Sequence, residues 1–376
     1  MRAAVLTAPG VIALREVPDP VRAPGDVLLR PIAVGVCGTD LHIFSGEGNY
    51  NLAPDGRALP LSTHPQILGH EIVAEVLDGG ALPPRTRVVV DQGLNCRSRG
   101  RAVPCVYCST GHSHHCAHYS EHGISGLPGG MAERLAIPAC NVLAIPTTLD
   151  LTSAAFTEPL ACVLHACEVL SLARHARFQW EASESARRIN TIAIAGAGPA
   201  GQLFVQVLRN VFGFRWRVLV SDPSPFKRYL AAQHGAEALD ARAAPFDELV
   251  RAATAGEGAE LVIEASGVGQ VFAELPGALR RQGTVLLYAH GHGGTPLSAL
   301  NALHWLEPVL LLPNGASGGL GADGRPLIYE RALTVLAEGA VRPEALVSKQ
   351  FHGLEAVSEA LGSSMAEDEI KRVLTF

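Results

Sequence analysis

The sequence lacks the features that mark a nucleic-acid-binding, membrane-spanning or exported protein. Basic residues are not in excess, because 30 lysines and arginines stand against 36 aspartates and glutamates, so charge favours neither nucleic acid nor an anionic membrane. No uncharged run is long enough to cross a bilayer. The opening residues, MRAAVLTAPG, lack the apolar core of a signal peptide. We therefore expect a cytoplasmic protein that binds neither nucleic acid nor a membrane.

What the sequence does contain is the composition of an ordinary enzyme. Its 376 residues are too many for one small core, so two domains are expected. Apolar residues make up 48% of the chain, and 39 glycines and 25 prolines imply many turns. In a reducing compartment, the eight cysteines are expected to be metal ligands or buried apolar residues rather than disulfide partners.

A glycine-rich turn follows a short apolar run led by β-branched residues, Thr191–Ala195. The glycines of this turn are Gly196, Gly198 and Gly201. The first makes a tight turn, the second lets a pyrophosphate approach the backbone, and the third lets a helix pack closely on the strand. That helix, expected at Pro199–Val211, begins with N–H groups and a dipole that favour phosphate. The order of strand, turn and helix predicts a dinucleotide site.

Asp222 follows the next expected strand, Arg217–Ser221, about twenty residues after the last glycine. A carboxylate at this position can accept hydrogen bonds from ribose hydroxyls and repels a 2′-phosphate, so the sequence favours NAD over NADP. Lys227 and Arg228 argue the other way, because either side chain can pair with such a phosphate. We assign Gly196, Gly198, Gly201, Asp222 and Lys227 to cofactor binding.

Strands and helices continue to alternate beyond this point. Strands are expected near Ala238 and at Glu260–Glu264, Gly283–Ala289 and Pro308–Leu312. Helices are expected at Pro225–His234, Pro245–Ala253, Gln270–Arg280 and Ser298–Trp305. Such alternation predicts an α/β domain with a doubly wound parallel sheet that binds its ligand at the carboxyl ends of the strands.

The first part of the chain is expected to be β-rich, and it carries residues suited to a metal. Cys37 follows a strand expected at Asp26–Val34, and His70 and Glu71 come about thirty residues later, with Glu158 further on. A lone cysteine after a strand is usually only buried. One thiolate, one imidazole and a carboxylate, however, make a set of three protein ligands for zinc that leaves a fourth position open for an alcohol or water oxygen.

The motifs Cys-Gly-Thr-Asp-Leu-His at 37–42 and Gly-His-Glu at 69–71 resemble those of the zinc-dependent medium-chain alcohol and polyol dehydrogenases. The resemblance covers nearly all of the chain. It implies that Cys37, His70 and Glu71 lie at a catalytic zinc, and that Glu158 either ligates this zinc or holds its water. Members of the family differ in which carboxylate binds. Glu158 can alternatively cap the helix that begins at Pro159.

The same resemblance assigns a proton relay to Thr39 and His42. The threonine hydroxyl would pass a proton from the bound alcohol through the nicotinamide ribose to the imidazole. Thr39 can instead be a turn hydroxyl, and His42 a surface histidine. In the loop at 44–66, Glu47, Asn49 and Asn51 can bind substrate hydroxyls or simply face solvent.

A second zinc site is implied by a cysteine-dense lobe. Its cysteines are Cys96, Cys105, Cys108 and Cys116. The lobe of the family reads Cys-x2-Cys-x2-Cys-x7-Cys; the last three cysteines keep this spacing, whereas the first gap is longer by the insertion RSRGRA. Four thiolates can close a tetrahedron with any loop length. Alternative ligands nearby are His112, His114 and His115. A redox pair of the two central cysteines is the competing interpretation.

The resemblance thus implies a zinc- and NAD-dependent dehydrogenase that oxidises a secondary alcohol of a polyol, sugar or hydroxy amino acid. Residues 1–160 and 326–376 would form a β-rich, GroES-like, zinc-binding catalytic domain, and residues 161–325 the Rossmann domain. Relatives are commonly homodimers or homotetramers. The alternatives are a dehydrogenase of simple alcohols or aldehydes with the same fold, and a protein that senses zinc or NAD without catalysis.

Overall fold

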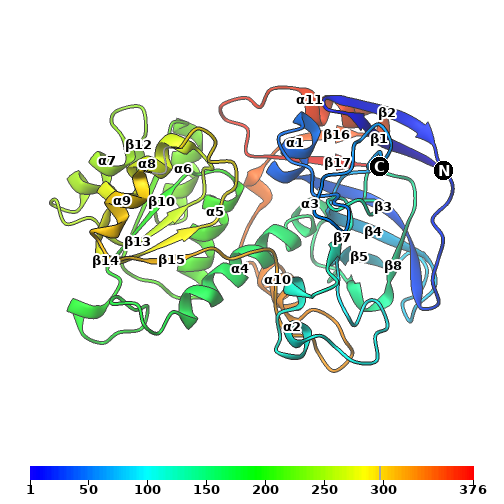
Figure 1. The fold of residues 1–376 in the computed structure, drawn as a ribbon, viewed down its shortest axis with the longest axis horizontal. Coiled ribbons are helices and arrows are strands. Elements are labelled where there is room, and N and C mark those ends of the chain that lie inside the picture. The colour runs from blue at the N-terminus through cyan, green and yellow to red at the C-terminus, as the bar shows by residue number, and fades with distance from the viewer. Residues whose placement is uncertain (296–297) are drawn as a thin grey trace. The chain divides into compact units, whose positions relative to one another are not determined.

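The computed structural model describes residues 1–295 and 298–376 (Figure 1). The chain divides into two compact units. The first unit combines Met1–Ala161 with Ala316–Phe376, and the second unit is Cys162–Gly315. The first unit is therefore built from both ends of the chain, and its returning segment begins about ten residues before the expected position 326.

The first unit is organised around one mixed sheet. Its strand order is β16-β17-β3-β4-β5-β9, with β8 also paired to β3. The bounds are β3 (Asp26–Val36), β4 (Glu71–Asp78), β5 (Arg87–Val90), β8 (Leu135–Pro138), β9 (Val142–Ala144), β16 (Val347–His352) and β17 (Lys371–Thr375). A separate hairpin joins β1 (Arg2–Ala8) to β2 (Val11–Glu16). Valine, leucine and isoleucine side chains from β3, β4 and β5 form one buried core, as β-branched strand sequences predict.

The strand β3 lies between β17 and β4, although these two strands are about 300 residues apart in sequence. In the register of the sheet, Gly35 faces Val373 on one side and Glu71 on the other. The last strand of the chain therefore runs beside the strand that leads to Cys37. This pairing places the C-terminal segment next to the expected metal ligands.

Short helices connect the strands of the first unit. They are α1 (Gly38–Ser45), α2 (Val106–Ser109), α3 (Leu151–Ala154), α10 (Leu327–Ala337) and α11 (Val357–Gly362). A longer helix, α4 (Thr157–Leu172), carries the chain from the first unit into the second. Within residues 1–295 and 298–376, no helix has both the length and the apolar character needed to cross a membrane.

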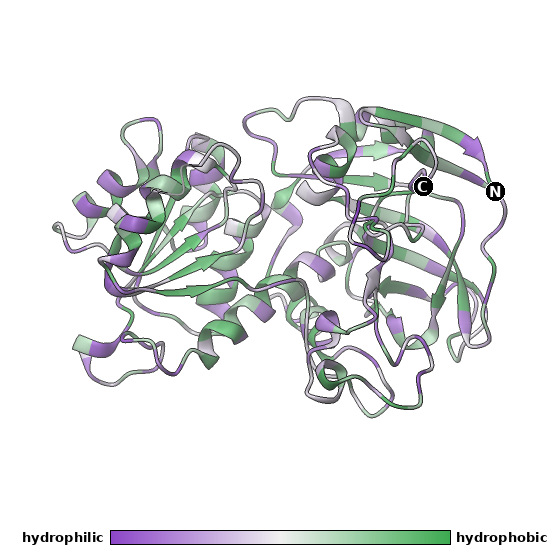
Figure 2. Cartoon of the chain, in the orientation of Figure 1, coloured by the Kyte–Doolittle hydropathy of each residue, from purple (hydrophilic) through white to green (hydrophobic). Residues whose placement is uncertain are grey.

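The second unit contains a six-stranded parallel sheet with the strand order β12-β11-β10-β13-β14-β15. The strands are β10 (Thr191–Ala195), β11 (Arg217–Asp222), β12 (Glu237–Asp240), β13 (Ala259–Glu264), β14 (Leu279–Leu287) and β15 (Val309–Leu311). This is the order of a doubly wound dinucleotide-binding sheet, whose direction of winding reverses between β10 and β13. The predicted fold class is confirmed. Figure 2 shows these strands as the hydrophobic centre of the unit, as burial on both faces requires.

Helices follow the strands in the predicted alternation. They are α5 (Pro199–Gln206), α6 (Pro225–Gln233), α7 (Phe246–Ala253), α8 (Gly269–Ala278) and α9 (Ala299–His304). Two boundaries differ by more than two residues from the expected ones. The helix expected to end at Val211 ends at Gln206 and continues as a wider π-helical turn over Val207–Val211. Residues Leu279 and Arg280, expected in a helix, begin β14, because Pro276 already lies in the last turn of α8.

Candidate active site

Cys37 stands between the end of β3 and the first turn of α1. Its backbone is extended, and its N–H donates a hydrogen bond to Oδ2 of Asp40 at 2.9 Å. The Asp40 side chain therefore caps the helix in the manner of a capping box. The thiol thus lies at the N-terminus of α1.

Asp40 also joins this helix to the residues that precede β4. Its carboxylate is fully buried, and Oδ1 accepts a hydrogen bond from the N–H of Gly69 at 3.1 Å. The same oxygen lies 3.4 Å from Nδ1 of His70. Burial lowers the pKa of the His70 imidazole, but the Asp40 carboxylate and, after it, Cys37 together raise it by more, so this pKa lies well above its ordinary value. A carboxylate behind a metal-binding histidine orients the ring and makes it a stronger ligand.

The structure brings Cys37, His70 and Glu71 together. One ligand atom from each of these residues lies within 4.8 Å of the others. His70 and Glu71 are buried, and Nδ1 of His70 has no hydrogen bond with good geometry to any described residue. Thiolate, imidazole and carboxylate are donors that zinc accepts, and three of them leave an open position. The chemistry of this cluster therefore fits zinc.

Lys371 lies next to this cluster and pairs with one of its members. Nothing in the sequence indicated this residue. Its Nζ lies 2.5 Å from the Glu71 carboxylate, and both side chains are almost fully buried. The pair forms across β3 at Gly35, where a Cβ atom would overlap Oε2 of Glu71. Burial lowers the pKa of Lys371, but the charge of Glu71, followed by that of Cys37, raises it by more, so the net shift is upward. Glycine at 35 thus makes the space for a buried ion pair.

Glu158 does not belong to the group of three, although it lies nearby. It is in the first turn of α4, and its Oε1 accepts a hydrogen bond from Nε2 of Gln92 at 3.2 Å. Its negative charge contributes to the raised pKa of Lys371. The two candidate carboxylates therefore have different partners, since Glu71 pairs with a lysine and Glu158 with an amide. A role for Glu158 as zinc ligand stays a prediction.

The two residues of the expected proton relay lie on α1 beside Cys37. The Thr39 hydroxyl is 3.8 Å from the Cys37 sulfur, and Nδ1 of His42 is 2.7 Å from Oε2 of Glu47. Glu47 thus contacts the histidine ring, and its expected contact with substrate stays a prediction. Asn49 donates its side-chain N–H to the carbonyl of Leu59 within the same loop. The relay itself stays a prediction.

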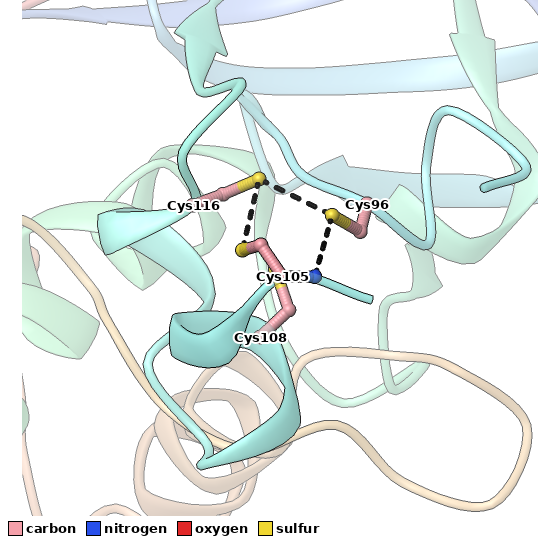
Figure 3. A group of neighbouring side chains, drawn as sticks. All are labelled: Cys96, Cys105, Cys108 and Cys116. Atoms are coloured by element: carbon pink, nitrogen blue, oxygen red, sulfur yellow. Dashed lines mark hydrogen bonds between the residues drawn. The ribbon is translucent and has the colours of Figure 1, made fainter. Parts of the chain in front are cut away.

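The four cysteines of the lobe converge in spite of the insertion between the first two (Figure 3). All four sulfur atoms lie within 4.8 Å of one another, and those of Cys96 and Cys116 are 3.7 Å apart. None of the eight cysteines, all of which lie in the described residues, forms a disulfide. A set of four thiolates at these distances fits a structural zinc. His114, one of the alternative ligands, is occupied elsewhere, with Nε2 3.2 Å from Asp91 and Nδ1 accepting the N–H of Ala316.

The backbone around the lobe gives its thiols different proton affinities. Hydrogen bonds from the N–H groups of Cys108 and Ala117 lower the pKa of the Cys105 thiol to about 6. Burial raises the pKa of the Cys108 thiol to about 12. In the metal-free protein, one thiolate is thus present at neutral pH before any metal binds.

The glycine turn in the second unit has the geometry that a dinucleotide needs. Gly196 has φ +95°, a conformation that other residues avoid. A Cβ atom at Gly201 would overlap the carbonyl oxygen of Gly196, so the third glycine brings α5 close to the turn. Gly198 caps α5 and has open space on its Cβ side, where a phosphate can approach the helix N-terminus.

Asp222 at the end of β11 supports this turn directly. Its carboxylate accepts hydrogen bonds of 2.8 Å from the N–H groups of Ala197 and Ser224. Arg228 is already engaged, since its guanidinium donates to Oδ1 of Asp240 and to the carbonyl oxygens of Asp222 and Pro223. Of the two basic residues that favour NADP, Lys227 is therefore the stronger candidate for pairing with a 2′-phosphate.

A dinucleotide-type sheet together with two clusters of metal-ligand side chains defines a metal-assisted, nucleotide-dependent oxidoreductase. Residues 23–147 match the family described as alcohol dehydrogenase GroES-like domain, and residues 199–308 match the zinc-binding dehydrogenase family. The chain is 33% identical over 385 residues to glucose 1-dehydrogenase 2 of Vulcanisaeta moutnovskia, covering 99% of this chain and 98% of the relative. It is 28% identical to the erythritol/L-threitol dehydrogenase of Mycolicibacterium smegmatis, with coverages of 93% and 91%.

Solved structures agree with this result. A zinc-binding dehydrogenase from Sinorhizobium meliloti 1021, bound to NADP, superposes with a TM-score of 0.77 at 27% identity, covering 100% of this chain and 98% of that one. The chain belongs to the zinc-dependent medium-chain alcohol and polyol dehydrogenase family. It is therefore an oxidoreductase with zinc and a nicotinamide dinucleotide as cofactors, and the expected GroES-like and Rossmann folds are confirmed.

The substitution Lys371→Met tests the buried ion pair. In the metal-free protein it leaves the Glu71 carboxylate buried and unpaired, so we expect the free energy of unfolding to fall by about 3–5 kcal/mol. Lys371→Arg keeps the charge and should lose less. Urea denaturation measures the difference. Lys349→Met is the matched control, because Lys349 pairs with Glu359 on the surface of the same unit and should change stability by less than about 0.5 kcal/mol. Equal stability of the Lys371→Met and wild-type proteins would contradict the role of the pair.

Alkylation by iodoacetamide tests the electrostatics of the cysteine lobe. In the metal-free protein, the reaction rate of Cys105 should rise with pH through a midpoint of about 6, because the thiolate is the reacting form. Cys108, whose pKa is raised to about 12, should react slowly over the same range. Peptide mapping by mass spectrometry after timed reactions between pH 5 and 9 measures both rates. A midpoint for Cys105 near the ordinary thiol value of about 8.5 would contradict the assignment.

Proposed function

We propose that this enzyme oxidises a secondary alcohol on a small, multiply hydroxylated molecule, such as a polyol, sugar or hydroxy amino acid, and transfers the hydride to NAD. The observation that carries the proposal is the cluster of Cys37, His70 and Glu71. The similarity to a glucose dehydrogenase and to an erythritol/L-threitol dehydrogenase supports this substrate class.

Each residue of the candidate site has a distinct part in the proposed reaction. Cys37 and His70 would hold the zinc with one of the two carboxylates, and zinc, when bound, polarises the alcohol oxygen and stabilises its alkoxide. Asp40 keeps the His70 ring in place from behind. Thr39 would take the alcohol proton, and His42 would carry it to solvent. Glu47 would orient the His42 ring through its contact with Nδ1.

We also propose that the protein is a homodimer or homotetramer of the cytoplasm. The sheet of the second unit ends at β15, and an edge strand can pair with another chain. Large apolar side chains on and beside this strand are exposed, including Trp305, Leu310 and Leu312. A second copy pairing at this edge would bury them. Thiolate ligands are compatible with a reducing compartment.

The substitution Cys37→Ser tests the catalytic assignment. Metal analysis of the wild-type protein should give one zinc for each of the two clusters, and the variant should lack one of them. Reduction of NAD, followed by NADH absorbance with a panel of polyols, sugars, inositols and hydroxy amino acids, should fall by more than about 100-fold. Cys140→Ser is the control, because this cysteine lies outside both clusters. Wild-type activity in Cys37→Ser would refute the proposed site.

The choice of cofactor is tested by comparing NAD with NADP. We expect kcat/KM to favour NAD by at least about tenfold, which corresponds to about 1.4 kcal/mol, because the buried Asp222 carboxylate repels a 2′-phosphate. Asp222→Asn should reduce this preference, and Lys227→Ala should increase it. A wild-type preference for NADP would show that Lys227 outweighs Asp222.

A further inference from the structure

A buried chain of hydrogen bonds leads from α10 to Glu158. The hydroxyl of Tyr329 donates to Oε1 of Gln92 at 2.5 Å, and Nε2 of Gln92 donates to Oε1 of Glu158 at 3.2 Å. Tyr329 and Gln92 are almost completely buried. Tyr329 lies more than two hundred residues from Gln92 in the sequence, yet their polar atoms meet inside the first unit. Such a chain polarises its members and fixes their orientations.

The direction of the Gln92 amide follows from this chain. A glutamine side chain can turn its oxygen and its nitrogen to either side at little cost. A carboxylate only accepts hydrogen bonds, so the amide NH2 group faces Glu158, and the reversed amide would set its oxygen against the carboxylate and repel it. The amide oxygen then accepts from the Tyr329 hydroxyl on the other side. Tyr329 therefore holds the amide in the direction in which Glu158 meets a donor.

The backbone of Gln92 is held as firmly as its side chain. The Asn141 amide donates to the carbonyl oxygens of Asp91 and Gly93, on either side of Gln92. The carbonyl of Gln92 itself accepts the N–H of His122 at 2.9 Å. Three consecutive carbonyl groups are thus occupied. A side chain on such a fixed segment can position its neighbour precisely.

This segment is also tied to the cysteine lobe and to the segment that returns from the second unit. Oδ1 of Asp91 lies 3.2 Å from Nε2 of His114, a residue between the lobe cysteines Cys108 and Cys116. Nδ1 of His114 accepts the N–H of Ala316 at 3.1 Å. The place of Gln92 is therefore set by two segments distant in sequence and not only by its own loop.

Glu158 stands where its orientation matters to the metal cluster. Glu158 is in the first turn of α4, and the centre of the Phe156 ring, two residues earlier, lies 5.8 Å from the Lys371 ammonium that pairs with Glu71. The start of α4 is therefore next to the ion pair of the metal cluster, and Glu158 connects it to Gln92 through a hydrogen bond. A neutral amide orients a carboxylate without neutralising it.

We propose that Gln92 and Tyr329 are positioning residues for the dehydrogenase reaction, and that they set the Glu158 carboxylate toward the zinc held by Cys37 and His70 or toward the molecule bound to that zinc. This inference rests on the proposed function of the same site. Residues that hydrogen-bond to metal ligands typically contribute about 10–100-fold to metal affinity or activity. The N–H donor of the Gln92 amide, rather than the volume of this side chain, is what orients Glu158.

Three variants separate hydrogen bonding from packing. Gln92→Met keeps the approximate volume and removes the donor, Gln92→Glu keeps the shape and replaces the donor with an acceptor, and Tyr329→Phe removes only the hydroxyl that orients the amide. Glu158→Gln is the reference for loss of the carboxylate charge. Thr334→Val is the control, because it removes a hydroxyl from the same helix as Tyr329, and this hydroxyl is exposed and donates to the carbonyl of Glu330 within α10.

Two measurements are made on each zinc-loaded variant. The first is the rate at which zinc is lost to dipicolinate, followed by metal analysis, and the second is kcat and KM with NAD and the best substrate of the panel. We expect Gln92→Met and Gln92→Glu to lose zinc from one site 10–100-fold faster and to lower kcat/KM by a similar factor, as Glu158→Gln does. Tyr329→Phe should fall between these variants and the wild type, and Thr334→Val should behave as the wild type does. Thermal denaturation shows that all variants are folded at the assay temperature.

The proposal is overturned if both Gln92 variants retain zinc and turn over as the wild type does. It is also overturned if Glu158→Gln behaves as the wild type, since no carboxylate would then need positioning; the proposed function would survive that result. A wild-type protein that reduces NAD with no member of the panel would instead defeat the proposed function. The zinc-loss rates would still decide whether Gln92 orients Glu158.

Discussion

The ion pair between Glu71 and Lys371 is the contact on which the arrangement of the first unit depends. Two opposite charges are removed from water there, and their mutual attraction offsets the free-energy cost of burying them. Forming the pair requires β17 to lie beside β3, and β3 beside β4, with Gly35 between the two side chains. The last strand of the chain is thereby fixed next to Cys37 and His70. A site assembled from both ends of the chain forms only when the whole unit is folded.

Much of the second unit could be predicted because its signals are local. Gly196 and Gly201 have conformational or spatial requirements that only glycine meets, and apolar β-branched runs such as Thr191–Ala195 indicate buried parallel strands. The cysteine lobe was predictable for a similar reason, since four thiols need only reach one point, whatever the length of the loop between Cys96 and Cys105. Helix ends were less certain, because packing decides them in the last turn.

The surroundings of the metal ligands could not be predicted, because each depends on contacts between segments distant in sequence. A lysine in a C-terminal strand normally faces solvent, and nothing near Lys371 signals that it pairs with a residue 300 positions earlier. The contact between Tyr329 and Gln92 could not be predicted either, because the sequence of α10 indicates only an ordinary amphipathic helix. His114 was considered as a ligand because of its neighbours in sequence, whereas the fold uses it to join Asp91 to Ala316. The metal-ligand candidates can thus be identified from the sequence, whereas the residues that hydrogen-bond or pair with them are known only from the fold.

The different partners of the two carboxylates have an electrostatic consequence for the site. The ammonium of Lys371 offsets the charge of Glu71, whereas the hydrogen bond from the Gln92 amide orients Glu158 without adding a positive charge. The fold thus supports the two carboxylates in different ways. Glu71 is held by an ion pair that joins both ends of the chain, and Glu158 by an amide that Tyr329 of α10 contacts.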